Sequence, residues 1–177
     1  AGLERRAGRR DPQVRWGRDA HPRHDQDDPD ARAIFDGLYA YYRGHPSENN
    51  HDLMAWLQLT GCVSSADSNS ASDGDIDIAY ALLLADRQWG SCGTYDYLSL
   101  ARRAIAAIVA ADLDRTRSYP KLGDWVLEDS VNYYDSTRTS DFIPDHFRVF
   151  GAVTGDPSTW NRVLDTTYGI VRHIQTY

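Results

Sequence analysis

Apolar residues recur at helical spacing in five segments between residues 28 and 177, and this repetition restricts the possible fold more than any other feature. Within each segment they lie three and four positions apart, which places them on one face of an α-helix. No segment alternates apolar and polar residues long enough to indicate a half-buried strand. The predicted helices cover about residues 28–44, 75–89, 97–113, 144–153 and 157–174. The pattern therefore predicts an all-α chain built from helix hairpins.

Residues 1–27 lack this periodicity and differ in composition from the rest of the chain. They hold seven arginines and five acidic residues, and their only sizeable apolar residues are Leu3, Val14 and Trp16. The whole chain has one lysine, Lys121, against 18 arginines, which suits a GC-rich gene read out of frame. We interpret residues 1–27 as a disordered or out-of-frame segment and residues 28–177 as the folded domain.

Composition excludes two broad classes of protein. The 177-residue chain has a net charge of −7, which argues against a nucleic-acid ligand because phosphate binding depends on clustered Lys and Arg. No run approaches the ~18 apolar residues that a membrane-spanning helix needs. Two cysteines, Cys62 and Cys92, are too few for a disulfide scaffold, and their spacing does not show whether they pair.

Three carboxylates gather where the second predicted helix begins. Asp73, Asp75 and Asp77 follow a loop rich in Ser and Asn, and the positive end of the helix dipole favours their ionised forms. One interpretation is that they only cap the helix and face solvent. Another is a calcium loop, since their spacing matches EF-hand positions 1, 3 and 5. That interpretation lacks the glycine and glutamate it needs, because Ile78 and Leu84 stand at those positions.

The stretch from Ala71 to Trp89 reads A-S-D-G-D-I-D-I-A-Y-A-L-L-L-A-D-R-Q-W and resembles the signature of glycoside hydrolase family 8. That family comprises bacterial endoglucanases together with xylanases, licheninases and chitosanases. Three further stretches are similar to family segments: Leu53-Met54-Ala55-Trp56, the run from Thr137 to Pro144, and Gly155-Asp156 followed by Trp160. The resemblance extends over nearly all of residues 28–177.

The resemblance implies a six-hairpin (α/α)6 barrel, of which this chain would form about the first half. It also implies endo-acting hydrolysis of β-1,4-linked glucan with inversion, carried by carboxylates without a metal ion or an organic cofactor. Asp73 matches the catalytic aspartate of the signature. In the family this position has been labelled a nucleophile, whereas an inverting mechanism would give it the role of binding and distorting the sugar ring. Both roles remain open at this stage.

Sugar binding needs flat apolar surfaces beside hydrogen-bonding groups, because pyranose rings stack their C–H faces on aromatic rings. Trp56 matches an aromatic residue of the family cleft. Asp75, Trp125 and Asp141 are the other predicted substrate-binding residues, and for Trp125 and Asp141 local packing is an equal alternative. Two further tryptophans and two histidines receive other predictions: Trp89 and Trp160 are expected in the core, and His146 and His173 at the surface or in caps.

Two catalytic groups of the family have no match in this sequence. The general acid would be a Glu in an S-E-G-like segment before the first matching helix, and the general base an Asp in the second half of the barrel. We therefore expect a fragment that is weakly active or inactive. The alternative is a non-catalytic helical carbohydrate-binding module. The expected partner is a β-glucan, bound by a monomer without nucleic acid or membrane, and its polymeric nature implies a secreted or periplasmic protein. Cellulose, xylan, chitosan and mixed-linkage glucan all remain open as substrates.

Overall fold

The computed structural model describes residues 29–176, which form an all-α fold of five helices. They are α1 (Pro29–Gly44), α2 (Ser72–Trp89), α3 (Tyr97–Ala107), α4 (Pro144–Thr154) and α5 (Pro157–Gln175). The all-α prediction is confirmed. None of the described helices is both long and apolar enough to cross a membrane. The interpretation of residues 1–27 falls outside the described residues.

Short elements link the helices. The strands β1 (Gln58–Leu59) and β2 (Val63–Ser64) pair antiparallel, as do β3 (Leu113–Asp114) and β4 (Tyr119–Pro120). The α-helical part of the third predicted helix is shorter than expected, because its last turn widens into the π-helical segment η1 (Ile108–Asp112). A 3-10 turn, η2 (Thr139–Asp141), precedes α4.

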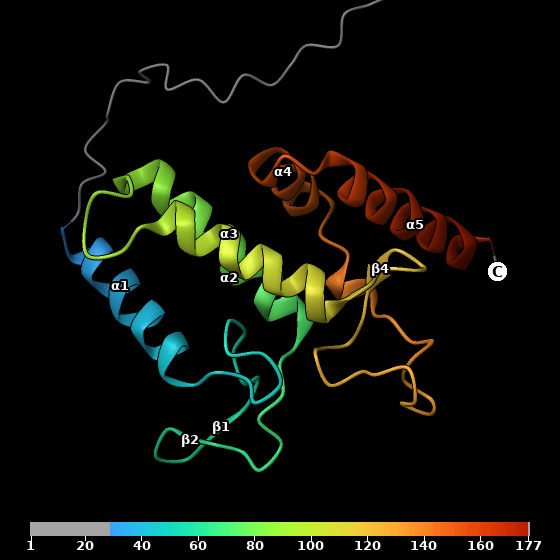
Figure 1. Cartoon of the computed structure of the whole chain (residues 1–177), viewed down its shortest axis with the longest axis horizontal. Helices are drawn as coiled ribbons and strands as arrows, with labels where there is room; N and C mark the ends of the chain where they lie inside the picture. The colour runs from blue at the N-terminus through green and yellow to red at the C-terminus, as the bar shows by residue number, and fades with distance from the viewer. Residues whose placement is uncertain (1–28, 177) are drawn as a thin grey trace, which may run out of the picture.

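The helices form two packed hairpins, α2 with α3 and α4 with α5, and α1 lies alongside the first (Figure 1). Trp160 of α5 is 1% exposed and packs on Phe147 and Phe150 of α4, with ring centroids 5.5 and 5.1 Å away. Trp89 is half-buried and lies 5.5 Å from the Phe35 ring of α1. Both tryptophans therefore belong to the core, as predicted.

Helix α1 is apolar on two adjacent faces and buries only one of them. Tyr39 and Tyr42 are buried, and Phe35 packs against the core from one turn earlier. Ile34 and Leu38 remain 64% and 66% exposed. The prediction of one continuous buried stripe was wrong in part, because positions 34 and 38 point about 100° away from 35 and 39 around the helix axis.

Two long loops meet at the end of the molecule where α2 begins (Figure 1). The Trp56 amide donates to the Asn69 carbonyl at 2.9 Å, and the Ser72 amide donates to the Leu122 carbonyl at 3.4 Å. Gly123 packs so closely on this junction that a Cβ atom there would lie 2.2 Å from the Ser70 carbonyl oxygen. The loops at residues 45–71 and 115–138 are thereby fixed to the start of α2.

Candidate active site

Asp73 lies in the first turn of α2 and faces outward. Its side chain is 42% exposed, and its Oδ1 lies 3.5 Å from Nη2 of Arg138. The same oxygen accepts a hydrogen bond from the Gly74 amide at 2.9 Å. The residue before it, Ser72, is buried, so the loop junction directs Asp73 away from the core. The first turn thus presents a carboxylate with one basic partner at the surface.

Arg138 connects Asp73 with the second predicted carboxylate of this region. Its Nε and Nη2 atoms each lie 3.2 Å from an oxygen of Asp141, and Nη2 also donates to the Leu122 carbonyl at 3.3 Å. The Asp141 side chain has no exposed surface. Burial raises the pKa of Asp141, and the hydrogen bond from Arg138 opposes that shift. Asp141 therefore holds Arg138 from the buried side. The predicted contact of Asp141 with substrate stays a prediction.

Arg138 is the residue of this arrangement that the sequence analysis did not name. It stands within the stretch from Thr137 to Pro144 that resembles a family segment, which is the signal that points to it. A guanidinium suits this position, since its planar fork binds one carboxylate with two hydrogen bonds and still reaches a second.

Two predicted aromatic residues lie at the same end of the molecule. Trp56 is 61% exposed, on the segment joined to Asn69. Trp125 is half-buried and meets Tyr133 edge-on with ring centroids 5.1 Å apart. Trp56 thus offers the flat, open apolar surface that a pyranose ring requires, and Trp125 offers less of its surface.

Asp75 does not share the environment of Asp73. It is 3% exposed, and its Oδ1 accepts a hydrogen bond from the Met54 amide at 3.2 Å. Burial raises its pKa to about 7. Residues two positions apart on a helix point about 200° apart, so Asp73 faces outward while Asp75 faces the interior. Its predicted contact with substrate likewise stays a prediction.

The calcium-loop alternative does not fit the structure. Asp73, Asp75 and Asp77 lie on a helix, where the first and third are exposed and the second is buried. Among the described residues, no three His, Cys, Asp or Glu side chains are arranged to hold a metal ion. Capping explains only part of the pattern. Ala71 at the N-cap makes no side-chain hydrogen bond, whereas Asp73 accepts one from the first-turn amide of Gly74. Asp75 accepts from the Met54 amide instead.

His146 is not the surface or capping residue that was expected. Its ring stacks on Tyr80 of α2 with centroids 3.7 Å apart, and its Nε2 lies 3.2 Å from Oδ1 of Asp77. Burial lowers the pKa of His146, and the nearby Asp77 opposes that shift. The prediction was wrong because α4 packs across α2, which no local pattern reveals. His173 is exposed, as expected.

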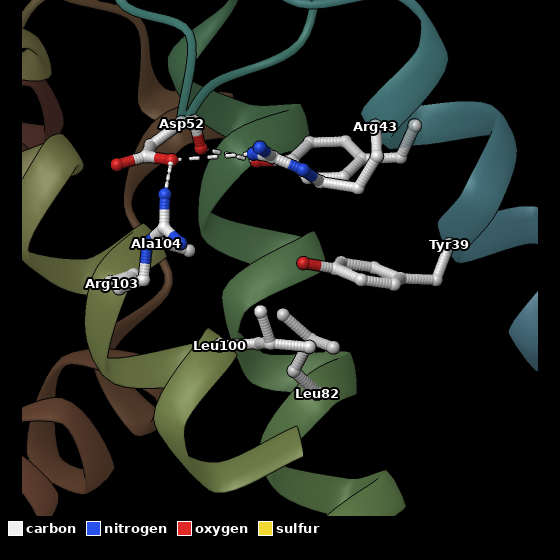
Figure 2. A pocket seen from close by; sticks show the side chains of 8 residues that line it. Tyr39, Arg43, Asp52, Leu82, Leu100, Arg103 and Ala104 are labelled. Atoms are coloured by element: carbon white, nitrogen blue, oxygen red, sulfur yellow. Dashed lines mark hydrogen bonds and ion pairs between the residues drawn. The ribbon is translucent and has the colours of Figure 1, made fainter. Parts of the chain in front are cut away.

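Among the described residues, a small pocket lies between α1, α2, α3 and the loop after α1, and Asp73 is not among its lining residues (Figure 2). Its volume is about 10 Å³, about the space of one water molecule. Asp52 lies at its edge and pairs with Arg43 at 3.3 Å and Arg103 at 2.5 Å. This pocket is too small for a sugar.

An exposed tryptophan beside hydrogen-bonding side chains suits the C–H faces and hydroxyls of a sugar ring. Comparison with known families identifies the class of protein. The family described as glycosyl hydrolases family 8 matches residues 28–176, so the chain belongs to this family. Its helices form part of the family's (α/α)6 barrel, as the resemblance implied.

Similar proteins agree with this assignment. A β-glucanase of Niallia circulans is 44% identical over 147 residues, covering 83% of this chain and 35% of the relative. An endoglucanase of Bacillus sp. strain KSM-330 is 38% identical over 141 residues, covering 80% of this chain and 29% of the relative. The apo structure of a β-1,3-1,4-glucanase from Paenibacillus sp. X4 matches with a TM-score of 0.78 and 45% identity, covering 82% of this chain and 38% of that one. The chain therefore spans between 29% and 38% of the length of these relatives.

Proposed function

We propose that this chain supplies the sugar-binding face around Asp73 in an endo-acting β-glucan hydrolase that cleaves β-1,4 bonds with inversion. Membership of the family and the names of the relatives, β-glucanase and endoglucanase, support the reaction class. The observation that carries the proposal is the exposed Asp73 carboxylate, held beside Arg138 at the end of the molecule where Trp56 is also exposed.

The geometry favours a binding and distorting role for Asp73. An inverting mechanism needs a general acid and a general base about 6.5–9.5 Å apart with a water between them. The carboxyl joined to Asp73 through Arg138 is that of Asp141, which has no exposed surface and therefore no access to such a water. We assign to Asp73 hydrogen bonds with sugar hydroxyls at the scissile bond, and to Arg138 the orientation of Asp73.

We assign the stacking of sugar rings to Trp56, which is exposed at the same end of the molecule as Asp73. Trp56 would hold the C–H face of a pyranose ring, while the Asp73 carboxylate accepts hydrogen bonds from hydroxyls at the ring edge. The names of the relatives, β-glucanase and endoglucanase, favour a polysaccharide or a long oligosaccharide as the substrate. Such polymers lie outside the cell, so we propose a secreted or periplasmic protein that acts as a monomer in polysaccharide degradation, cellulose included.

Affinity electrophoresis in gels containing barley β-glucan, carboxymethylcellulose, xylan or chitosan tests the proposal on the chain itself. We expect retardation in the two glucan gels, with Asp73→Asn and Trp56→Ala each weakening it at least about tenfold, or about 1.4 kcal/mol. Asp165→Asn is the matched control, because Asp165 is exposed on α5 away from this face. Equal retardation of the Asp73→Asn and unchanged chains would refute the assigned role.

A reducing-end assay on the same samples separates hydrolysis from binding. Release of reducing ends that depends on Asp73 supports the hydrolase. Retardation without release by any form of the protein, longer forms included, favours the carbohydrate-binding module instead.

A further inference from the structure

Three carboxyl groups are buried together beneath the start of α2. Asp75 comes from α2, Asp112 ends η1, and Asp124 comes from the long loop after β4. Their residues are 3%, 0% and 5% exposed. Buried carboxylates are costly unless hydrogen bonds or opposite charges compensate for the lost hydration. The way each oxygen is satisfied therefore indicates which of the three carries a charge.

Asp124 is surrounded by donors. The Ser70 amide donates to its Oδ1 at 2.8 Å and the Asn49 side-chain amide at 3.4 Å, while the Ser47 hydroxyl donates to its Oδ2. All of these partners suit an ionised carboxylate, which can only accept hydrogen bonds. Both oxygens of Asp124 are thus satisfied.

Asp75 and Asp112 are satisfied on one oxygen only. Oδ1 of Asp75 accepts from the Met54 amide at 3.2 Å, and Oδ1 of Asp112 accepts from the Ser70 hydroxyl at 3.2 Å. The Oδ2 atoms of both residues are buried and have no donor. The two side chains nevertheless lie within hydrogen-bonding contact of each other. Two ionised carboxylates in that arrangement would repel each other, whereas one proton between them would give both unpaired oxygens a partner.

We propose that Asp75 and Asp112 share one proton at neutral pH, carried on Asp112 and donated to Asp75. Asp75 is hydrogen-bonded to Met54, and Asp112 is hydrogen-bonded to Ser70. The shared proton therefore links the first turn of α2 to the two loop segments that precede it. Asp75 and Asp112 are therefore positioning residues for Asp73, which lies in the same turn. The shared proton does not depend on the proposed function. Only the statement that Asp75 and Asp112 position Asp73 rests on the proposed function.

The charges around the pair are consistent with a retained proton. Burial is the main cause that raises the pKa of both carboxyls, and the charge on Asp124 adds to it. Lys121 is the nearby cation, but its own pKa is lowered by burial. The Tyr42 hydroxyl also faces Asp75, and burial raises its pKa, so it stays neutral.

The sign of the pH effect follows from these directions. Both pKa values lie above the ~4 of an unfolded aspartate, so the folded chain binds the proton more tightly than the unfolded chain. The stabilisation is complete below pH ~4. It is lost as the pH rises through the raised pKa values of the pair, of which that of Asp75 is about 7. His146 acts in the opposite direction, because its lowered pKa makes protonation destabilising.

Carbon-13 NMR of aspartate carboxyls across pH 4–9 tests the proposal on the unmodified chain. We expect one carboxyl to keep the chemical shift of a protonated acid at pH 7 and to lose it in Asp112→Asn. If every aspartate carboxyl has the shift of an ionised group at pH 7, the proposal is wrong. A change of this spectrum on adding calcium or a chelator would also overturn it, because a cation would then occupy the place of the proton.

Urea unfolding at each pH gives the second readout. Asn at position 112 can still donate to Asp75, so Asp112→Asn should fold as well as the unmodified chain at neutral pH. Its midpoint should change less between pH 4 and 8 than that of the unmodified chain. Asp112→Ala removes the donor and should lower the midpoint at all pH values. If Asp112→Asn and Asp112→Ala lower the urea midpoint equally, the proposal is wrong. Position 112 would then require a side chain of a certain volume and not a shared proton.

Discussion

At the scale of single residues, Arg138 determines how the candidate site is held. It contacts one buried carboxylate, Asp141, and one exposed carboxylate, Asp73. Asp73 and Asp141 are acidic and Arg138 is basic, so the acidic groups outnumber the basic one at the end of the molecule where Trp56 is exposed. Because Asp141 fixes the guanidinium with one hydrogen bond and a second ion-pair contact, the position of Arg138 does not depend on bound sugar.

The two Asp–Arg pairs around α4 allow a matched test of this arrangement. Asp141→Ala should lower the free energy of unfolding by about 1.5 to 3 kcal/mol, because buried hydrogen bonds to charged groups are lost. Asp145 pairs with Arg148 at the same spacing of three residues, but its side chain is 88% exposed. Asp145→Ala should change stability little, since exposed ion pairs contribute little. Equal losses in urea unfolding would contradict the supporting role of Asp141.

The family resemblance indicated Asp73 as the catalytic residue and Trp56 as a substrate-binding residue; both side chains are exposed in the structure, and their roles stay predictions. It grouped Asp75 with Asp73, although the helix turns the two in opposite directions. The buried carboxyls Asp112 and Asp124 escaped notice, because each receives its partners from segments more than 40 residues away in the chain. Local patterns carry no information about such contacts.

At the scale of elements, the helices were predictable because each carries its own apolar stripe, and α5 also carries a start signal. Asp156 caps α5 by accepting from the Thr159 amide at 3.1 Å, with Pro157 in the first turn, as its sequence suggests. The widening of α3 into η1 was not predictable, since its apolar spacing continues unchanged. That widening matters for the fold, because it ends with Asp112 buried.

The end of α4 gives a prediction with an internal control. Gly155 closes that helix with φ of +71°, and a Cβ there would meet no atom within 4 Å. Gly155→Ala should destabilise the chain by about 1 to 2 kcal/mol through backbone strain alone. Gly169, inside α5, also has open space around it, and Gly169→Ala should stabilise by about 0.5 to 1 kcal/mol. Thermal unfolding in which both variants shift the same way would contradict the assigned conformations.

At the scale of the whole molecule, the residues that would bind sugar lie at one end, and apolar side chains remain exposed elsewhere. Ile34 and Leu38 of α1 are more than half exposed, as are Leu84 of α2 and Ile174 of α5. The chain spans 35% of the β-glucanase of Niallia circulans. A matching stretch within that relative would place other helices beside these side chains, which makes a chimera the natural setting for a test of catalysis.

The most direct measurement is reducing-end release from barley β-glucan by a chimera in which residues 28–176 replace the matching stretch of that β-glucanase. We predict that the chimera cuts the polymer and that Asp73→Asn lowers kcat/KM by about 100-fold, through lost binding and distortion of the sugar ring. Asp165→Asn should leave the rate unchanged. A folded chimera that cuts equally well with Asn at position 73, or that cuts no β-glucan at all, would contradict the account.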